Sequence, residues 1–407
     1  MTLDQGPTAD GSTSADRSTS AYAAMADGRA AADGRAVADG RAVANGRAVA
    51  DRRAGLPRLR IAQVAPPLEP IPPSGYGGTE RIVNELVREL VARGHDVTTF
   101  GPGDSDIPGR LIPTVPEALR PKGFGGDPSQ YLQRTIEMLL ERTDEFDFVH
   151  AHLEWFNPIL VRVSPMPTVA TFHGRLDYPW SRDILLRSGG RYVAISQSHA
   201  ATQPLVEWAG IVLNGLTLDG APMGIERGED VCFVGRIQPE KGILDAIEIA
   251  KRSGRRLRIA AKAGHMPHEV SYYEEVFQPA VAAAGSAVEF LGELPRSDRD
   301  RLFAESYAKL MPGSWPEPFG LVAIEALACG TPVIARRVGA LPEIIRDGVD
   351  GFFGETVDEM IDALDRVATL DRAATRAYVL ERFSGRRMTD DYEAVYARVL
   401  AESNGEG

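Results

Sequence analysis

The chain has few of the features that mark secreted, membrane-spanning or disulfide-stabilised proteins. Its 407 residues include two cysteines, Cys232 and Cys329, which are too few for a disulfide scaffold. Both lie in apolar runs and are expected to be buried thiols of a reducing compartment. No stretch approaches the ~18 apolar residues of a membrane span, and the N-terminus has no basic or apolar signal region. The sequence therefore predicts a cytoplasmic protein without a stable membrane anchor.

Positive charge is also scarce. Lysine and arginine total 45 against 57 aspartates and glutamates, which gives a formal net charge of −12. Because binding to phosphate backbones requires a basic surface, nucleic acid is not an expected partner. A local basic cluster is interpreted as a solvated helix end. It comprises Lys251, Arg252, Arg255, Arg256 and Arg258.

Residues 1–55 have low complexity and repeat a hexapeptide close to ADGRAV. Alanine and valine are too small to fill the coils of a β-helix, and frequent glycine and aspartate disfavour an α-helix. This segment is predicted to be a disordered leader.

From residue 56 onward, short apolar runs alternate with helical patterns. Arg58–Val64 is a predicted strand, and the helix that follows carries apolar residues at positions 82, 83, 86, 87, 90 and 91 before Gly94 ends it. The alternation restarts after a polar, glycine-rich seam at residues 214–230. This pattern predicts an α/β protein with two Rossmann-like domains, residues 56–216 and 217–385, and a final helix in residues 386–407. Ligands are expected in a cleft between the domains, at the carboxyl ends of their strands.

The first candidate site is the loop of residues 74–78, between the first strand and its helix. Its glycines allow backbone N–H groups to approach an anion at the helix N-terminus. A dinucleotide fingerprint would require glycine where Glu80 stands, so a nicotinamide cofactor is not expected. Taken alone, the loop fits a plain turn equally well.

The second candidate site is the loop of residues 235–242, which follows the strand VCFV. Arg236 and Lys241 stand five residues apart at the end of a strand. An arginine fork and a lysine point charge suit a diphosphate. The alternative interpretation is solvated charge in a surface loop.

The third and densest candidate site spans residues 312–332. Glu317 and Glu325 stand eight residues apart, the first in a loop and the second in a helix. Their carboxylates can accept hydrogen bonds from hydroxyl groups, as sugars require. The backbone N–H groups of Phe319, Gly320 and Leu321 open that helix and can face a polar ligand.

These segments resemble the family 4 glycosyltransferases, which are retaining enzymes of the GT-B fold with nucleotide-sugar donors. The resemblance spans residues 58 to about 400. It rests on GGTER after the first strand, TFHG at 171–174, FVGR with EKG, and the run PEPFGLVAIEALACGTPVIA, which contains the E-x7-E signature.

The resemblance implies a role for each site residue. Glu317 would hold the transferred sugar and Glu325 the ribose, while Arg236 and Lys241 would bind the diphosphate and stabilise its departure. Further contacts would come from the backbone of Gly77 and Gly78, from the carbonyl of His173, and from the backbone of Phe319, Gly320 and Leu321. The donor, a UDP- or GDP-sugar, would be a substrate rather than a cofactor, with no metal. Residues 56–216 would bind a hydroxylated small molecule or glycan, and residues 217–385 the donor.

Three alternatives stay open at this point. Retention can proceed by two displacements through a carboxylate nucleophile, or by attack from the face of the leaving group. A GT-B epimerase or phosphorylase could use the same cleft, although nothing resembles a pyridoxal lysine site. A non-catalytic sugar-nucleotide sensor is also conceivable, although every expected charged position is filled.

Several other residues have a structural interpretation. Asp104 and Asp106 form a D-x-D pattern in a polar loop, where metal binding is not expected. His150 is expected in the core, His152 in the cleft, and Ser196 as a helix N-cap. Lys262 could be a third phosphate contact or a surface lysine.

The acceptor pocket is expected to be lined by loops at residues 66–76, 101–128 and 174–190. They carry the aromatic residues Tyr76, Phe124, Tyr178 and Trp180.

Overall fold

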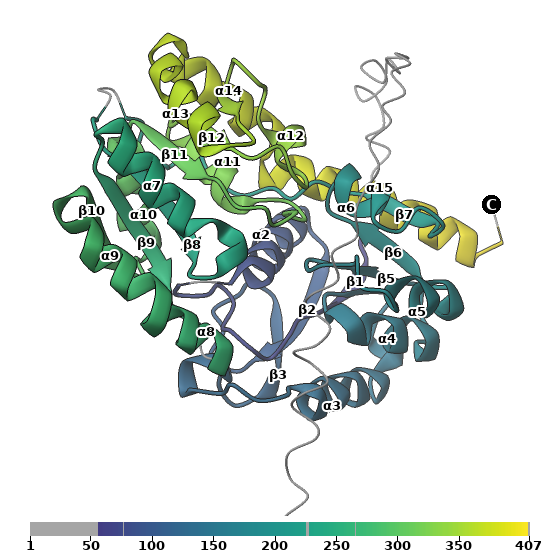
Figure 1. The fold of residues 1–407 in the computed structure, drawn as a ribbon. Helices are drawn as coiled ribbons and strands as arrows, with labels where there is room; N and C mark the ends of the chain where they lie inside the picture. Colours follow the sequence, from purple (N-terminus) through teal and green to yellow (C-terminus); the bar gives the residue numbers. More distant parts are fainter. Residues whose placement is uncertain (1–55, 76, 225–227, 265, 406–407) are drawn as a thin grey trace, which may run out of the picture. The chain divides into compact units, whose positions relative to one another are not determined.

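The computed structural model describes residues 56–75, 77–224, 228–264 and 266–405. The predicted leader at residues 1–55 and Tyr76 lie outside the described residues. Two parallel sheets with flanking helices occupy the described part of the chain, as Figure 1 shows. The predicted α/β class is therefore confirmed.

The first sheet has the strand order β3-β2-β1-β4-β5-β6-β7, and every neighbouring pair is parallel. Its strands are β1 (Arg60–Val64), β2 (Asp96–Pro102), β3 (Arg110–Val115), β4 (Phe148–Ala151), β5 (Thr168–Thr171), β6 (Arg191–Ala194) and β7 (Trp208–Ile211). Its helices are α2 (Gly78–Ala92), α3 (Ser129–Leu140), α4 (Asn157–Val163), α5 (Ser181–Ser188) and α6 (Gln197–Ala201).

The second sheet has the order β10-β9-β8-β11-β12-β13, again with parallel neighbours. Its strands are β8 (Val231–Arg236), β9 (Leu257–Lys262), β10 (Val288–Gly292), β11 (Ala308–Met311), β12 (Val333–Ala335) and β13 (Gly351–Phe353). The helices that follow it along the chain or connect its strands are α7 (Ile243–Ser253), α8 (Pro267–Tyr272), α9 (Gln278–Ala284), α10 (Arg296–Glu305), α11 (Leu321–Ala328), α12 (Leu341–Ile344), α13 (Val357–Arg366), α14 (Arg372–Arg382) and α15 (Gly385–Ser403).

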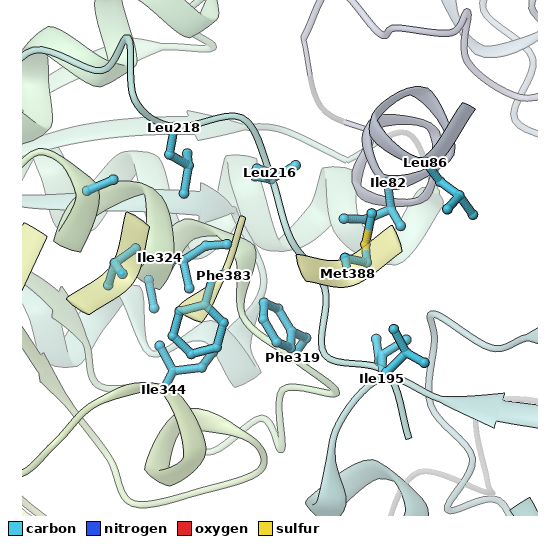
Figure 2. Packing of buried hydrophobic residues seen from close by; sticks show 14 of the residues in the cluster. Ile82, Leu86, Ile195, Leu216, Leu218, Phe319, Ile324, Ile344, Phe383 and Met388 are labelled. Atoms are coloured by element: carbon cyan, nitrogen blue, oxygen red, sulfur yellow. The ribbon is translucent and has the colours of Figure 1, made fainter. Parts of the chain in front are cut away.

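The central strands are buried because helices cover both faces of each parallel sheet. Four of the five residues of β1 are fully or almost fully buried, and all four residues of β4 and β11 are buried. The apolar stripe predicted for α2 packs inward through Ile82 and Leu86. Figure 2 shows these two side chains in the same cluster as Phe319 and Phe383 from the second half of the chain.

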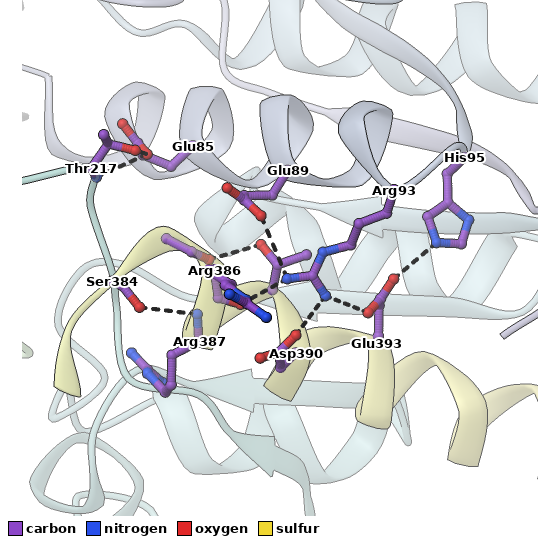
Figure 3. Close-up of polar contacts among 12 residues, drawn as sticks. Glu85, Glu89, Arg93, His95, Thr217, Ser384, Arg386, Arg387, Asp390 and Glu393 are labelled. Atoms are coloured by element: carbon purple, nitrogen blue, oxygen red, sulfur yellow. Dashed lines mark hydrogen bonds and ion pairs between the residues drawn. The ribbon is translucent and has the colours of Figure 1, made fainter. Parts of the chain in front are cut away.

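The helix α15 returns to the first half of the chain and packs against α2, β5 and β7. Figure 3 shows its polar contacts at the C-terminal end of α2: Arg93, the residue that follows α2, pairs with Glu393 at 2.5 Å and with Asp390 at 2.7 Å. His95 contacts the other oxygen of Glu393 at 3.0 Å. The two chain crossings between the halves lie side by side, because Leu216 forms a parallel bridge with Ser384.

Local details test several sequence predictions. Cys232 and Cys329 are buried free thiols, and Ser196 caps α6 by accepting a hydrogen bond from the backbone of His199, as predicted. The basic cluster lies at the end of α7 and on β9, where Arg252 pairs with Asp358 and Arg256 with Glu289. The sequence patterns did not predict β3, β7 or β13.

Candidate functional site

A cavity of about 610 Å³ lies at the carboxyl ends of both sheets. Residues at or just beyond the ends of β1, β6, β8, β9 and β11 border it. All ten predicted site residues line this cavity: Gly77, Gly78, His173, Arg236, Lys241, Glu317, Phe319, Gly320, Leu321 and Glu325. The structure thus gathers residues that lie up to 248 positions apart (77 to 325) around one space.

The two predicted phosphate-binding cations stand on one wall of the cavity. Arg236 is the last residue of β8, and its Nη1 lies 3.9 Å from Oε1 of Glu269. Lys241 follows in a short 3-10 turn, with its Nζ 5.1 Å from the centre of the Trp315 ring. Both side chains keep solvent contact, 32% and 16% exposed, so each can reach a ligand in the cavity.

Glu317 lies in the loop between β11 and α11, with its Oε1 2.5 Å from Nζ of Lys241. The backbone carbonyl of Glu317 accepts a hydrogen bond from Ala340. Gly339 has a φ of +57°, and a Cβ there would collide with the backbone of Glu317. This close approach fixes the loop that presents the carboxylate. The cation and the carboxylate neutralise one another in the ligand-free protein.

Gly320 ends the same loop and caps α11 with a φ of +105°, a conformation that favours glycine. Gly320 and Leu321 line the cavity at the start of α11, where the first N–H groups of a helix have no carbonyl partner within the helix. The side chain of Phe319 is 2% exposed and packs in the core, so only its backbone is available to a ligand.

Glu325 lies one turn further into α11 and is 1% exposed. Its Oε1 accepts hydrogen bonds from Arg81 of α2 and, at 3.0 Å, from Arg299 of α10. Burial alone would raise the pKa of Glu325, but the two guanidinium groups outweigh it and lower the pKa to about 2. Its buried Oε2 has no hydrogen-bond partner in the described part of the chain. This oxygen can accept a hydrogen bond from a hydroxyl group of a ligand.

The opposite wall comes from the start of α2. Gly77 precedes the helix and Gly78 begins it; a Cβ on Gly78 would lie 3.6 Å from Leu321 at the start of α11. Two helix N-termini thus meet at the cavity, which favours an anionic ligand. Burial raises the pKa of Glu80, in the first turn of α2, to about 7.

His173 follows β5 and borders the same cavity. Its backbone N–H donates to Oε1 of Glu154 at 3.0 Å, and the N–H of Gly174 donates to the same carboxylate at 3.2 Å. Glu154 has a φ of 49°, an uncommon conformation outside glycine. Burial raises the pKa of Glu154 to about 7, although the two backbone donors oppose the shift.

Lys309 is a further functional candidate, which no sequence pattern indicates. It lies in the centre of β11, is 1% exposed, and its Nζ donates to the carbonyl of Val234 at 3.3 Å. Burial lowers the pKa of Lys309 to about 8. It lines the same cavity as Arg236 and Lys241, so it adds to the positive charge there.

The remaining sequence candidates divide between the cavity and the scaffold. Tyr178 lines the cavity and stacks against Trp180, whereas Phe124 packs edge-on against Tyr131 and does not line it. Lys262 borders the cavity and lies 3.8 Å from Glu293. Asp104 accepts a hydrogen bond from the backbone of Ala118.

The part of the chain that the structure describes holds neither a cluster of metal ligands nor a helix that could cross a membrane. No group of three or more histidine, cysteine, aspartate or glutamate side chains there is arranged to hold a metal ion. No helix there combines the length and the apolar composition that a membrane crossing requires.

Two Rossmann-like domains that share a cavity at the carboxyl ends of their parallel sheets define a GT-B class of protein. A family model described as "Glycosyl transferases group 1" matches residues 223–378, and one described as "Glycosyltransferase Family 4" matches residues 76–203. The chain belongs to the family 4 glycosyltransferases.

Solved structures confirm the GT-B fold. AviGT4, a glycosyltransferase involved in avilamycin A biosynthesis, superposes with a TM-score of 0.63 at 23% identity over 84% of this chain and 98% of its own. Anabaena Alr3699/HepE in complex with UDP and glucose gives a TM-score of 0.64 at 19% identity, covering 84% of this chain and 100% of its own.

Curated relatives are more similar in sequence but match a shorter stretch. The D-inositol 3-phosphate glycosyltransferase of Mycobacterium leprae (strain Br4923) is 36% identical over 201 residues, 46% of this chain and 44% of the relative. The protein of the same name from Mycobacterium tuberculosis (strain F11) is 37% identical over 190 residues, 43% of this chain and 38% of the relative. The alignment thus spans less than half the length of each relative.

Proposed function

We propose that the chain is a retaining glycosyltransferase that moves a sugar from a nucleoside diphosphate sugar to a hydroxyl group of a small molecule or glycan. One observation carries the proposal: the cations Arg236 and Lys241, the two carboxylates of the E-x7-E signature and two helix N-termini line the same cavity. An uncharged ligand would need none of the cations, and a simple anion would not need the carboxylates. A diphosphate joined to two hydroxylated groups uses all of them.

The proposed chemistry follows from where charge develops. The bond between the anomeric carbon and the diphosphate oxygen breaks, and negative charge grows on the leaving diphosphate. Arg236 and Lys241 would stabilise this charge, and the N–H groups of α11 would assist. The acceptor oxygen forms the new bond to the anomeric carbon, and its proton passes to the departing diphosphate. Glu317 would hold hydroxyl groups of the sugar, and Oε2 of Glu325 a ribose hydroxyl.

The donor is proposed as a class of compound, and the acceptor only as a first compound to test. A UDP- or GDP-sugar is the proposed donor, and the solved relative in complex with UDP and glucose makes UDP-glucose the first to test. The name of the curated relatives makes D-inositol 3-phosphate the first acceptor to test. Retention is checked by the anomeric configuration of the product in a proton NMR spectrum.

The function is tested by thermal-shift binding to UDP, GDP, ADP, TDP and their sugars, with and without EDTA. A ligand that binds only the folded protein raises Tm by mass action. One nucleotide series should raise Tm and EDTA should leave the shift unchanged. The absence of a shift with every nucleotide would contradict the proposed donor site. Binding without transfer to any acceptor would favour a sugar-nucleotide sensor.

The cation assignment yields a separate prediction. Arg236→Ala and Lys241→Ala should each weaken UDP binding about 10- to 100-fold, because each removes one charge-assisted contact with the diphosphate. Isothermal titration calorimetry measures the loss directly. Arg252→Ala is the matched control, since this arginine is 46% exposed and pairs with Asp358 outside the cavity lining. Unchanged affinity in both site variants would overturn the assignment.

A further inference from the structure

A continuous chain of hydrogen bonds joins the C-terminal helix α15 to His173 at the cavity. The Nε2 of His173 lies 3.0 Å from Nδ1 of His152, and Nε2 of His152 lies 3.0 Å from Oε1 of Gln63. The amide nitrogen of Gln63 donates to the hydroxyl of Tyr396 at 3.3 Å. Apart from His173, all of these side chains are buried to 0% exposure, so water does not compete for their hydrogen bonds.

The series of hydrogen bonds continues beyond Tyr396. Its hydroxyl lies 2.8 Å from Nδ1 of His150, whose Nε2 lies 2.8 Å from Oγ1 of Thr171. The hydroxyl of Tyr392 ends this branch, 3.1 Å from Oγ1 of Thr171. Gln63, His150 and Thr171 stand on the adjacent strands β1, β4 and β5, and both tyrosines come from α15.

Burial lowers the pKa of His150 and His152 well below the usual range, and that of His173 to about 3, so all three rings are neutral near pH 7. A neutral imidazole has one donor nitrogen and one acceptor nitrogen. The direction of one hydrogen bond therefore sets the direction of the next along the chain.

The distances around Tyr396 set this direction. The 3.3 Å contact with Gln63 is long for an O–H···O bond and suits a weak amide N–H donor. The 2.8 Å contact with His150 suits donation by the tyrosine hydroxyl. The carbonyl oxygen of Gln63 then faces His152 and accepts from its Nε2. The Nδ1 of His152 is consequently an acceptor, so His173 must donate through Nε2.

We propose that Tyr396 is a positioning residue that acts through Gln63 and His152 to hold His173 in the Nε2–H tautomer, with Nδ1 as an acceptor for a ligand hydroxyl. No hydrogen bond to this Nδ1 occurs within the described part of the chain, and His173 borders the cavity. The ligand part of the proposal rests on the proposed function, because the group that would donate a hydrogen bond to Nδ1 is a hydroxyl of the transferred sugar or of the acceptor. The C-terminal helix thereby sets the protonated nitrogen of a histidine that lines the same cavity as Arg236 and Lys241.

The tautomer is measured on the ligand-free full-length protein. Histidine-labelled protein contains seven imidazoles, and the His173→Asn variant identifies the signals of His173 by their absence. Two-bond proton–nitrogen NMR spectra should show a protonated Nε2 and an unprotonated Nδ1 in His173. A protonated Nδ1 would overturn the proposal. This measurement needs no nucleotide sugar, so its outcome is separate from failure of the proposed function.

The variants Tyr396→Phe and Tyr392→Phe form a matched pair, because each removes one buried hydroxyl from the same helix. Tyr396→Phe should convert the His173 signals to a mixture of tautomers, whereas Tyr392→Phe should leave them unchanged. With UDP-glucose as the probe, the ratio of the Kd for UDP to that for UDP-glucose should fall about fivefold in Tyr396→Phe only. Gln63→Met should reproduce the effect of Tyr396→Phe if that variant folds poorly. Equal spectra for the two tyrosine variants would overturn the proposal.

Discussion

Replacing Glu317 with glutamine is expected to lower kcat for sugar transfer by about 10²- to 10³-fold while leaving UDP binding intact. The carboxylate is placed to hold the sugar, not the nucleotide, and a neutral amide accepts hydroxyl hydrogen bonds less strongly than a carboxylate. The Kd for free UDP should stay within about threefold, because Lys241 loses its 2.5 Å partner and remains available to the diphosphate. Initial rates and calorimetry on the same preparation separate the two effects.

The control for this experiment is Glu248→Gln, a change of the same chemistry on the exposed surface of α7. Glu248 is 48% exposed and pairs with Lys251. Its variant should match the unmodified protein in both measurements. If Glu317→Gln lost nucleotide binding and transfer to the same extent, the carboxylate would serve to hold Lys241 and the loop in place. A variant with normal transfer would remove Glu317 from the site altogether.

The fold was predictable where apolar runs were long and periodic. The stripe of α2 and the buried strands β1 and β8 follow directly from their sequences. The missed strands carry weaker patterns. β7 reads Trp-Ala-Gly-Ile and its residues are only partly buried, β3 contains Pro113, and β13 has three residues. These segments become strands because a neighbouring strand supplies hydrogen bonds, which a sequence window does not reveal.

The ten predicted site residues lie around one cavity because their motifs follow strand ends, and the carboxyl ends of parallel strands meet at one edge of a sheet. Their ion-pair partners were missed because they lie far away in the sequence. Arg81 meets Glu325 across 244 positions. The sequence did carry one indication of this ion pair. A positive charge in the first turn of a helix is unfavourable with the helix dipole, so an arginine there predicts a nearby anion. Lys309 gave no such signal, since one lysine in an apolar strand resembles an edge position.

The second large effect concerns stability. Glu325→Gln should destabilise the protein by about 3 kcal/mol, because it removes the carboxylate that accepts hydrogen bonds from the guanidinium groups of both Arg81 and Arg299 in a largely buried site. These arginine side chains are 14% and 11% exposed, which places the effect at the low end for a broken buried pair. Urea unfolding at pH 7 measures it. Glu141→Gln, whose carboxylate is 52% exposed, is the control and should change stability by less than about 0.5 kcal/mol.

The difference in free energy of unfolding between the unmodified protein and Glu325→Gln should depend on pH, which provides an independent check. The pKa of Glu325 is about 2 in the folded protein against an ordinary value of 4.5, so the folded state binds its proton less readily than the unfolded state. The contribution of Glu325 is therefore complete above about pH 4.5 and is lost as pH falls toward about 2. Glu80 and Glu154 act in the opposite sense, because their pKa values are raised to about 7 and their protonation favours the fold. Subtracting the Glu325→Gln curve from that of the unmodified protein removes those two groups. The difference should stay level from pH 7 to 5 and then shrink; a difference that shrank already above pH 5 would show that Glu325 does not hold its charge through the two arginines.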